Sequence, residues 1–528
     1  MMKIKGKKHS VKKEWWETWE KNVKGYARII TYVYLLCIIV LSPFYAPEGY
    51  VNIGINKFQF FKNAGIVCFT MLVPAVVLLL LINWKKRIVV KLSVTDIAML
   101  LYGTAVLLSF VCTDWKENAL WGTDGWYMGT LTQLMFVAIY FAVSRCLDNE
   151  KIWYSIFLAV SFLIFLLGLL NRFSVYPIEM EGANPIFIST LGNINWFCSY
   201  WMVVFPIGLV LYWLGEGNTV LKKAGLILYI IVGFMTGIVQ GSSSGFLALG
   251  AMVAVLFCLS FKEGEKLLRW LELLLLFAVS AFSISVLKNW FPAHLNYQDV
   301  IEEKITEYSG IMLIFVTVVV CYAVLHFLIR QKHLQIKKFS FLRNVIVGMV
   351  LFTAAVIGAL LVYYSVTPEA AANSRVAQAF IIDSDWGNSR GTTWKAGADA
   401  FRTMSVGRKL VGIGPDCFYL YVYGIDEIAN RLYNVFGDAR LTNTHNEWLT
   451  ILINTGICGF VTYIAVFVSA VLRQLKAGKN KEIVLVSTVC IISYTVHNMV
   501  SFQQIICTPV VFILLGMGER ILSKKEKN

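Results

Sequence analysis

The sequence predicts an all-α, polytopic integral membrane protein with about 14 transmembrane helices and one long folded external loop. The first observation is the composition: 58% of the 528 residues are hydrophobic, 15% are charged, and the mean hydropathy is +0.66. Soluble domains carry about 25% charged residues. The second observation is that the apolar residues form repeated runs of roughly 18–22 residues, the length of a helix that crosses a bilayer.

The third observation is that the clusters of basic residues fall in alternate loops between the expected spans. The spans are expected near residues 36, 73, 103, 136, 161, 204, 232, 253, 277, 319, 356, 460, 492 and 513. With a cytoplasmic N-terminus, the basic clusters all fall inside, as the positive-inside rule requires. They lie at residues 3–28, 85–91, 222–223, 262–266, 330–343, 473–481 and 520–527. Topology thus accounts for the net charge of +15, and no nucleic-acid partner is expected.

Five segments follow from this topology. They are a cytoplasmic basic head with an interfacial helix (1–25), spans 1–11 (26–366), a long external loop (367–446), spans 12–14 (447–522) and a cytoplasmic tail (523–528). The head carries Trp15, Trp16 and Trp19 on one helical face, which suits the headgroup layer; a disordered head is the alternative. The run after the head is too long for a cleavable signal peptide. The external loop far exceeds about 15 residues and is not of low complexity, so it is expected to fold.

No metal or redox cofactor is expected. Most of the 11 cysteines lie inside apolar runs. The chain has no CxxC motif and no cysteine–histidine set at zinc spacing.

The segment DSDWGNSRGTTWKAGADAFRTM (383–404) in the external loop carries the first candidate. Ser389 or a neighbouring polar residue is expected to cap a helix that runs to about Met404. Helical periodicity places Arg390, Trp394, Gly397, Phe401 and Met404 on one face. A guanidinium in the first turn of a helix favours an anion such as phosphate or diphosphate. The alternative is a surface arginine paired with Asp383 or Asp385.

His445 is the second candidate, in THNEW directly before an apolar run. A histidine facing water there has a pKa near 6.5 and is largely neutral at pH 7. A neutral imidazole accepts a proton from an attacking hydroxyl. The alternative is a capping or interface histidine. Asn446 and Glu447 either orient the ring or cap the next span.

Several segments, taken together and in this order, resemble the O-antigen ligase and O-antigen polymerase superfamily of bacterial membrane glycosyltransferases. They are ENALWGTDGWYMGTLTQL (117–134), LGNINWFCSYWMVVFPIGL (191–209), QGSSSGFLAL (240–249), SRGTTWKAG, GIGPDCF and THNEWLTILINTGICGF. The resemblance covers roughly residues 90–516. It implies a GT-C-like fold in the bacterial cytoplasmic membrane.

The resemblance also implies an activity. These enzymes transfer a glycan from an undecaprenyl-diphosphate carrier to an acceptor hydroxyl at the outer face of the membrane, with inversion and without nucleotide sugar or metal. Arg390 would contact the diphosphate and His445 would activate the acceptor, with Trp394 and Asn446 as further substrate-binding candidates. The acceptor is a glycan, a lipid or a protein, and membrane lipid surrounds the protein.

One position departs from the family pattern. Many members carry an arginine in the hairpin where this chain has SSSG (242–245). Arg375, Arg402 and Arg408 are the nearest candidates for the missing charge. His497, near the end of a span, either lines the same cavity or packs between helices.

Two other functions compete with the glycosyltransferase. A transporter or flippase of a small anion or a lipid-linked glycan would carry ionisable groups and broken helices near mid-span. The spans here are almost free of charge, and the polar residues concentrate in one external loop. A structural or assembly subunit without catalysis is the third possibility, because the hairpin arginine is absent.

Overall fold

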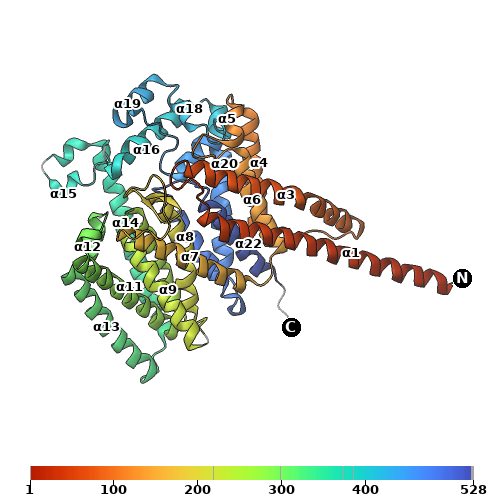
Figure 1. Ribbon diagram of the computed structural model, residues 1–528, viewed down its shortest axis with the longest axis horizontal. Helices are drawn as coiled ribbons and strands as arrows, with labels where there is room; N and C mark the ends of the chain where they lie inside the picture. The colour runs from red at the N-terminus through yellow and green to blue at the C-terminus, as the bar shows by residue number, and fades with distance from the viewer. Residues whose placement is uncertain (1, 218, 298, 373, 385, 525–528) are drawn as a thin grey trace.

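The computed structural model describes residues 2–217, 219–297, 299–372, 374–384 and 386–524, with side chains except at 2–15, 375 and 388. The fold is all-α (Figure 1). In the described chain, strands are limited to β1 (Phe187–Ile188) and β2 (Gly192–Asn193), which pair antiparallel. The predicted all-α polytopic architecture is confirmed.

Ten helical segments in the described chain are long and apolar enough to cross a membrane. They are α1 (Met2–Leu36) continued by η1 (Cys37–Leu41) and α2 (Ser42–Phe44), α3 (Ile53–Lys85), α4 (Val94–Cys112), α7 (Glu150–Arg172), α8 (Ile194–Leu214), α9 (Val220–Val239), α11 (Gly264–Trp290), α13 (Tyr308–Arg330), η3 (Ile336–Phe339) with α14 (Ser340–Val366), and α20 (Glu447–Leu475). Shorter apolar helices are α6 (Thr130–Cys146), α10 (Ser244–Ser260) and α21 (Val484–His497), and α22 (Thr508–Ser523) ends the described chain. Each expected span centre falls in a different one of these segments.

Helix α1 runs without a break from Met2 to Leu36, so the head and the first span form one helix. The sequence analysis expected the head as a separate interfacial helix. Pro43, in the short helix α2, marks the end of this first segment. The described backbone therefore shows no turn that would lay the head flat on a membrane surface.

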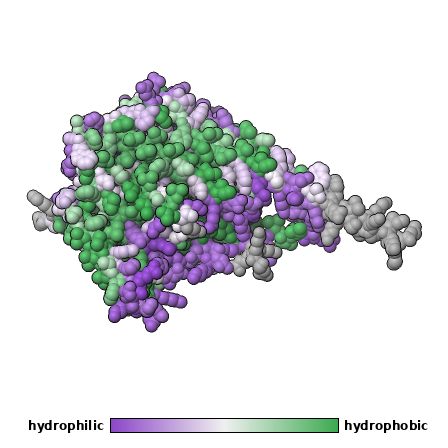
Figure 2. Space-filling view, turned by 60° about the horizontal axis from the view of Figure 1, so that its bottom comes forward, coloured by the Kyte–Doolittle hydropathy of each residue, from purple (hydrophilic) through white to green (hydrophobic). Residues whose placement is uncertain are grey.

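The core of the bundle surrounds α8. In its apolar window 94% of the residues are buried, and large side chains such as Trp201 and Trp213 are enclosed. Helices α13 and α14 are, in contrast, largely exposed, and α14 has no buried residue. Figure 2 shows the consequence on one face of the molecule: apolar residues cover most of it, and hydrophilic residues gather at its margins. Such a surface suits a hydrocarbon environment.

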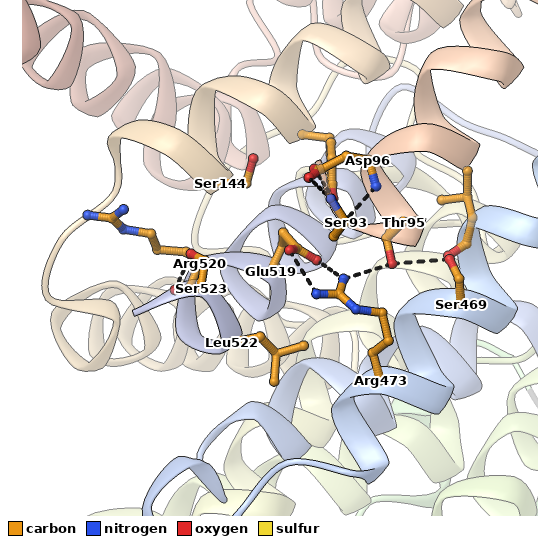
Figure 3. Close-up of polar contacts among 12 residues, drawn as sticks. Ser93, Thr95, Asp96, Ser144, Ser469, Arg473, Glu519, Arg520, Leu522 and Ser523 are labelled. Atoms are coloured by element: carbon orange, nitrogen blue, oxygen red, sulfur yellow. Dashed lines mark hydrogen bonds and ion pairs between the residues drawn. The ribbon is translucent and has the colours of Figure 1, made fainter. Parts of the chain in front are cut away.

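Charged side chains join the ends of four helices on the side that the basic clusters assign to the cytoplasm (Figure 3). Arg473 of α20 pairs with Glu519 of α22 and donates to Thr95 of α4 at 3.1 Å. Asp96 of α4 accepts hydrogen bonds from Arg145 of α6 at 2.7 Å and from Ser93 at the start of its own helix. Glu519 and Asp96, the two buried carboxylates of this cluster, thus each have a cationic partner, which offsets the cost of removing them from water.

The opposite side carries the short helices. They are α5 (Lys116–Trp121), η2 (Pro292–His294), α12 (Val300–Ile305) and, in the long loop, η4 (Pro368–Ala371), α15 (Arg375–Gln378), α16 (Trp386–Thr403), α17 (Val406–Val411), α18 (Phe418–Val422) and α19 (Asp426–Phe436); η5 (Lys479–Lys481) lies between α20 and α21. The loop is folded: α5, α16, α18 and α19 gather at one end of the molecule in Figure 1. A buried cluster that includes Met404, Phe418 and Leu432 of the loop also contains Ile453 of α20. The loop is therefore fixed to the bundle by its own apolar core.

Candidate active site

His445 lies in the turn that leads into α20. Asn446 caps this helix, because its side-chain oxygen accepts the N–H of Leu449 at 3.1 Å. The backbone of His445 is left-handed, with φ 51°, and its N–H donates to the side chain of Asn443 at 2.9 Å. Its ring meets Phe502 edge-on, with centroids 5.0 Å apart, and its buried Nδ1 has no partner. Packing thus fixes the ring while one nitrogen stays free for a ligand.

The imidazole of His445 is less basic than the sequence analysis expected. Burial, and next the positive charge of Arg390, lower the pKa of His445 to about 4. The expectation of a pKa near 6.5 assumed a ring facing water, whereas the residue is half-buried. His445 is therefore neutral at pH 7, which agrees with the requirement for a proton acceptor.

Arg390 lies in α16, which begins at Trp386 rather than at a cap on Ser389. Gly387 and Ser389 have φ values of 61° and 64°, so the first turn is irregular. The guanidinium donates from Nη1 to the carbonyl of Gly387 at 2.9 Å, and its buried Nε has no partner. Burial lowers the pKa of Arg390, although an arginine remains protonated at neutral pH.

The helix of Arg390 packs directly on the turn of His445. Thr393, one turn after Arg390, donates from its hydroxyl to the carbonyl of Thr444 at 2.8 Å. Gly397 makes the close approach possible: a Cβ there would lie 2.8 Å from the side chain of Leu449 and 2.9 Å from that of Thr444. The two candidates, 55 positions apart in the sequence, are thus carried on touching elements, within electrostatic reach of each other.

The other expected substrate-binding residues divide into two groups. Trp394 lies beside Trp386, with ring centroids 5.3 Å apart, and its buried indole N–H has no partner. Arg402 has its side chain 81% exposed and lies 3.7 Å from Asp399. Neither Arg402 nor Asn446, which serves as the helix cap, is shown facing a ligand site.

Arg408 and Arg375 complete the comparison with the sequence analysis. Arg408 pairs with Asp114 and lies over the rings of Trp115 and Tyr421 at 5.6 and 5.9 Å. It therefore has partners that anchor α17 to the loop before α5. The side chain of Arg375 lies outside the described residues.

Several residues of the candidate elements carry buried polar atoms without partners, as do Asn454 and Gln504. Among the described side chains they include Arg390 Nε, Trp394 Nε1, His445 Nδ1, Asn454 Oδ1 and Gln504 Oε1. Buried polar groups in folded proteins are nearly always hydrogen-bonded, so such atoms call for a ligand or water. Three of these atoms belong to Arg390, Trp394 and His445, which α16 and the turn before α20 carry, so this contact is a candidate binding site.

The family comparison addresses the same segment. Residues 305–464 match the family described as O-antigen ligase. This match supports the resemblance of the chain to the O-antigen ligase and polymerase superfamily. No curated protein matches the chain. At the level of the family, this match supports an O-antigen ligase- or polymerase-like membrane glycosyltransferase, and the matched O-antigen ligase domain contains both Arg390 and His445.

The sequence analysis missed an arginine beside the hairpin that joins α9 to α10. Arg172, at the end of α7, donates to the carbonyls of Val239 at 2.8 Å, Pro185 at 2.7 Å and Gln240 at 2.7 Å. Arg172 precedes the O-antigen ligase domain in the sequence. The only signal for it there was its position at the end of a span. Its donors hold the hairpin backbone, so it shapes the hairpin that lacks an arginine of its own.

His497 belongs to a buried chain of hydrogen bonds. Its Nε2 lies 3.1 Å from the hydroxyl of Ser244 in the hairpin, and its Nδ1 lies 2.8 Å from Asn498 Oδ1. The amide nitrogen of Asn498 donates to Glu447, which also accepts from Tyr494 at 2.7 Å. His497 therefore has the partners of a packing histidine. This chain of hydrogen bonds connects the α9–α10 hairpin to Glu447, the first residue of α20, which lies two positions after His445.

Asp416 is the second residue that sequence reasoning missed, within the GIGPDCF motif. Its buried carboxylate accepts the backbone N–H groups of Thr123 at 2.7 Å and Met128 at 3.0 Å. Burial raises the pKa of Asp416 to about 7. Gly122, with φ 101°, leaves room for the carboxylate. Asp416 thereby ties the O-antigen ligase domain to the loop at residues 122–129.

Proposed function

We propose that the protein transfers a glycan from an undecaprenyl-diphosphate-linked donor to an acceptor hydroxyl at the outer face of the bacterial cytoplasmic membrane. The observation that carries the proposal is the contact between α16 and the turn before α20. This contact joins the elements that carry a guanidinium and a neutral imidazole within electrostatic reach of each other, each with a buried nitrogen that lacks a partner. Both termini are cytoplasmic, and residues 367–446 are external.

Arg390 stabilises the leaving group in this proposal. The bond between the anomeric carbon and the diphosphate oxygen breaks, and negative charge grows on the diphosphate. A guanidinium in a partly buried site stabilises that charge more than one in water. Trp394, whose N–H is unpartnered, is a further donor on the same helix.

His445 accepts the proton of the acceptor hydroxyl as its oxygen attacks the anomeric carbon. Attack from the face opposite the diphosphate inverts the configuration at that carbon. Because Arg390 lowers the pKa of His445, an anion bound at Arg390 raises it again. The donor thus increases the basicity of His445 in the complex in which a base is needed.

Helix α14 supports a donor attached to lipid. It has no buried residue and leads directly into the loop that carries Arg390. The loop folds back on the helix end, where the N–H of Ile382 donates to the hydroxyl of Ser365 at 2.8 Å. A polyprenyl chain beside α14 stays in hydrocarbon while its diphosphate reaches the external loop.

The test is to express the variants Arg390→Ala and His445→Ala in cells that lack the native gene. Both variants are expected to reach the membrane, to abolish long-chain glycan and to accumulate lipid-linked precursor. Mass spectrometry of the precursor identifies the diphosphate, and NMR of the anomeric centre before and after transfer reads the inversion. Normal glycan from both variants would reject the proposal.

Matched controls separate the site from its surroundings. Lys395→Ala removes an exposed charge from α16, and His294→Ala removes an exposed histidine from another external segment. Both are expected to leave glycan synthesis unchanged. Precursor confined to the cytoplasmic leaflet in the Arg390 and His445 variants would indicate failed transport instead, and the transporter function would then replace the transferase.

A further inference from the structure

Aromatic rings form a continuous line that starts at His445. Phe502, which meets His445 edge-on, also meets Trp126 at 4.6 Å with an interplanar angle of 90°. Trp126 in turn meets Trp196 at 6.0 Å and 77°. Phe502 is buried, whereas both tryptophans are half-buried and keep part of their ring surface open. The line thus leads from the candidate base to accessible aromatic surface.

A small cavity lies on one side of Trp126. Trp126, Phe502, Asn443, Asp416 and Asn454 are among its lining residues, and its volume of about 30 Å³ suits one or two water molecules. Asn454 is 5% exposed, and its side-chain oxygen has no partner. That oxygen requires a donor from whatever occupies the cavity.

A second cavity lies beside the same ring. Trp126, Trp196, Lys57 and Gln504 line it, and its volume of about 10 Å³ suits a single water. Gln504 is 3% exposed, and its side-chain oxygen has no partner. The ammonium of Lys57 donates to the carbonyls of Ser42 at 2.7 Å and Pro43 at 2.9 Å. An ammonium has three N–H groups, so one remains for a ligand.

We propose that Trp126 and Trp196 form the acceptor subsite and that the acceptor they bind is a carbohydrate. The inference rests on the proposed function, which brings an acceptor hydroxyl to His445. Sugar C–H groups pack on the open ring surface of the two tryptophans. Sugar hydroxyls, which both donate and accept, reach the oxygens of Asn454 and Gln504 and the third N–H of Lys57. They replace the waters that otherwise satisfy these groups.

The polar lining distinguishes a sugar from an apolar acceptor. Hydrocarbon that displaced the waters of the two cavities would leave two buried oxygens without donors, which costs about 1–3 kcal/mol for each group. A sugar supplies several hydroxyls within one ring, at the spacing of neighbouring carbon atoms. The combination of open indole surface with unpaired amide oxygens therefore selects a polyhydroxylated ligand.

The experiment introduces the photo-crosslinking residue p-benzoylphenylalanine at position 126 in cells, with position 196 as the second site. Irradiation is expected to attach glycan to the protein, detected by glycan staining. Mass spectrometry of the adduct is expected to show carbohydrate at the crosslink without polyprenyl diphosphate on that glycan. The same residue at position 270, in the cytoplasm-proximal part of α11, is the negative control.

Three outcomes would overturn the assignment. A glycan adduct that still carries the diphosphate would place the donor at these rings. A protein adduct would change the class of acceptor. Absence of glycan on both crosslinking variants, in cells that still make the polymer, would remove the subsite altogether.

Two substitutions separate sugar binding from packing. Trp126→Phe keeps an aromatic ring, whereas Trp126→Met fills a similar volume without one. The methionine variant is expected to lower polymer formation about tenfold, equivalent to about 1.4 kcal/mol, while the phenylalanine variant retains most activity. Both are expected to unfold at the same temperature, and Trp84→Met, which replaces an exposed ring at the end of α3, is expected to behave as wild type. Equal activity of the Phe and Met variants would contradict the proposal, even if His445→Ala abolishes transfer.

Discussion

At the scale of single residues, sequence patterns selected two candidate residues on elements that the structure brings into contact, but they did not predict the electrostatics of these residues. The motifs around Arg390 and His445 predicted an anion site and a base, and the structure places both on touching elements. The pKa of His445 could not be predicted, because it depends on burial and on a charge 55 positions away. Glu447 follows the same logic: Tyr463 of its own helix donates to it, but its other two donors, Tyr494 and Asn498, come from α21 and the C-cap of that helix.

The titration of His445 is therefore a direct prediction. NMR of the labelled imidazole is expected to give a midpoint near 4, and Arg390→Gln is expected to move it toward 6.5. In the unfolded chain the pKa is about 6.5, so below this value the unfolded state binds more protons. The stability contributed by neutral His445 is thus lost as the pH falls from about 6.5 toward 4. Lys395→Gln should leave the midpoint unchanged, and a wild-type midpoint near 6.5 would contradict the buried geometry.

Glu447→Gln is a second prediction at this scale. The carboxylate accepts from Tyr463, Tyr494 and Asn498, and a glutamine amide presents N–H groups to at least one of these donors. We expect a loss of about 1–3 kcal/mol in the free energy of unfolding in detergent, with reduced glycan synthesis. The exposed Glu427→Gln is the control. Unchanged thermal unfolding of Glu447→Gln would show that the carboxylate network does not hold the turn.

At the scale of elements, the sequence predicted helices well and their interruptions poorly. Apolar runs identified every long helix, since length and hydropathy are local properties. The break in α20 at Gly456, where φ is 68°, has no local signal beyond the glycine itself. Its cause is tertiary: the carbonyls of Ile453 and Asn454 accept the N–H groups of Ile413 and Gly414 at 3.2 and 3.0 Å. The GIGPDCF motif, interpreted from sequence as a turn, binds α20 through this break.

Gly456→Ala tests the break. A Cβ at this position would collide with the backbone at Leu410 and Gly412, in addition to the left-handed φ. Backbone strain of this kind costs about 1–3 kcal/mol. We expect proteolysis of the external loop to accelerate while the remaining spans stay folded, and Gly478→Ala, where a Cβ has open space, serves as the control. Equal proteolysis of both variants would exclude this role.

At the scale of the whole molecule, hydropathy predicted the bundle, whereas the orientation predicted from the charge distribution stays a prediction. The sequence could not predict that the long loop attaches to the first half of the chain through Asp416 and residues 122–129. This attachment joins segments nearly 300 positions apart. The same limit applied to Arg172 beside the hairpin. Such contacts depend on tertiary placement, which no local pattern records.

Cysteine labelling tests the proposed orientation of the protein in the membrane. Cysteine introduced at Asp438 is expected to react with a membrane-impermeant maleimide in intact cells. Cysteine at Lys479 is expected to react only after permeabilisation. The parent variant should carry serine in place of Cys112, Cys321 and Cys458, which are exposed in the spans. Reaction of the Lys479 variant in intact cells would reverse the orientation proposed here.

Helix α14, which has no buried residue, contrasts with α8, whose side chains are almost all enclosed. Random apolar replacement along residues 345–360 should therefore be tolerated, whereas similar shuffling of α8 should not. Neutral substitutions would accumulate in α14, whereas selection would remove them from α8. A library that randomises each helix in turn, sequenced after growth selection, would record that asymmetry as two different rates of survival.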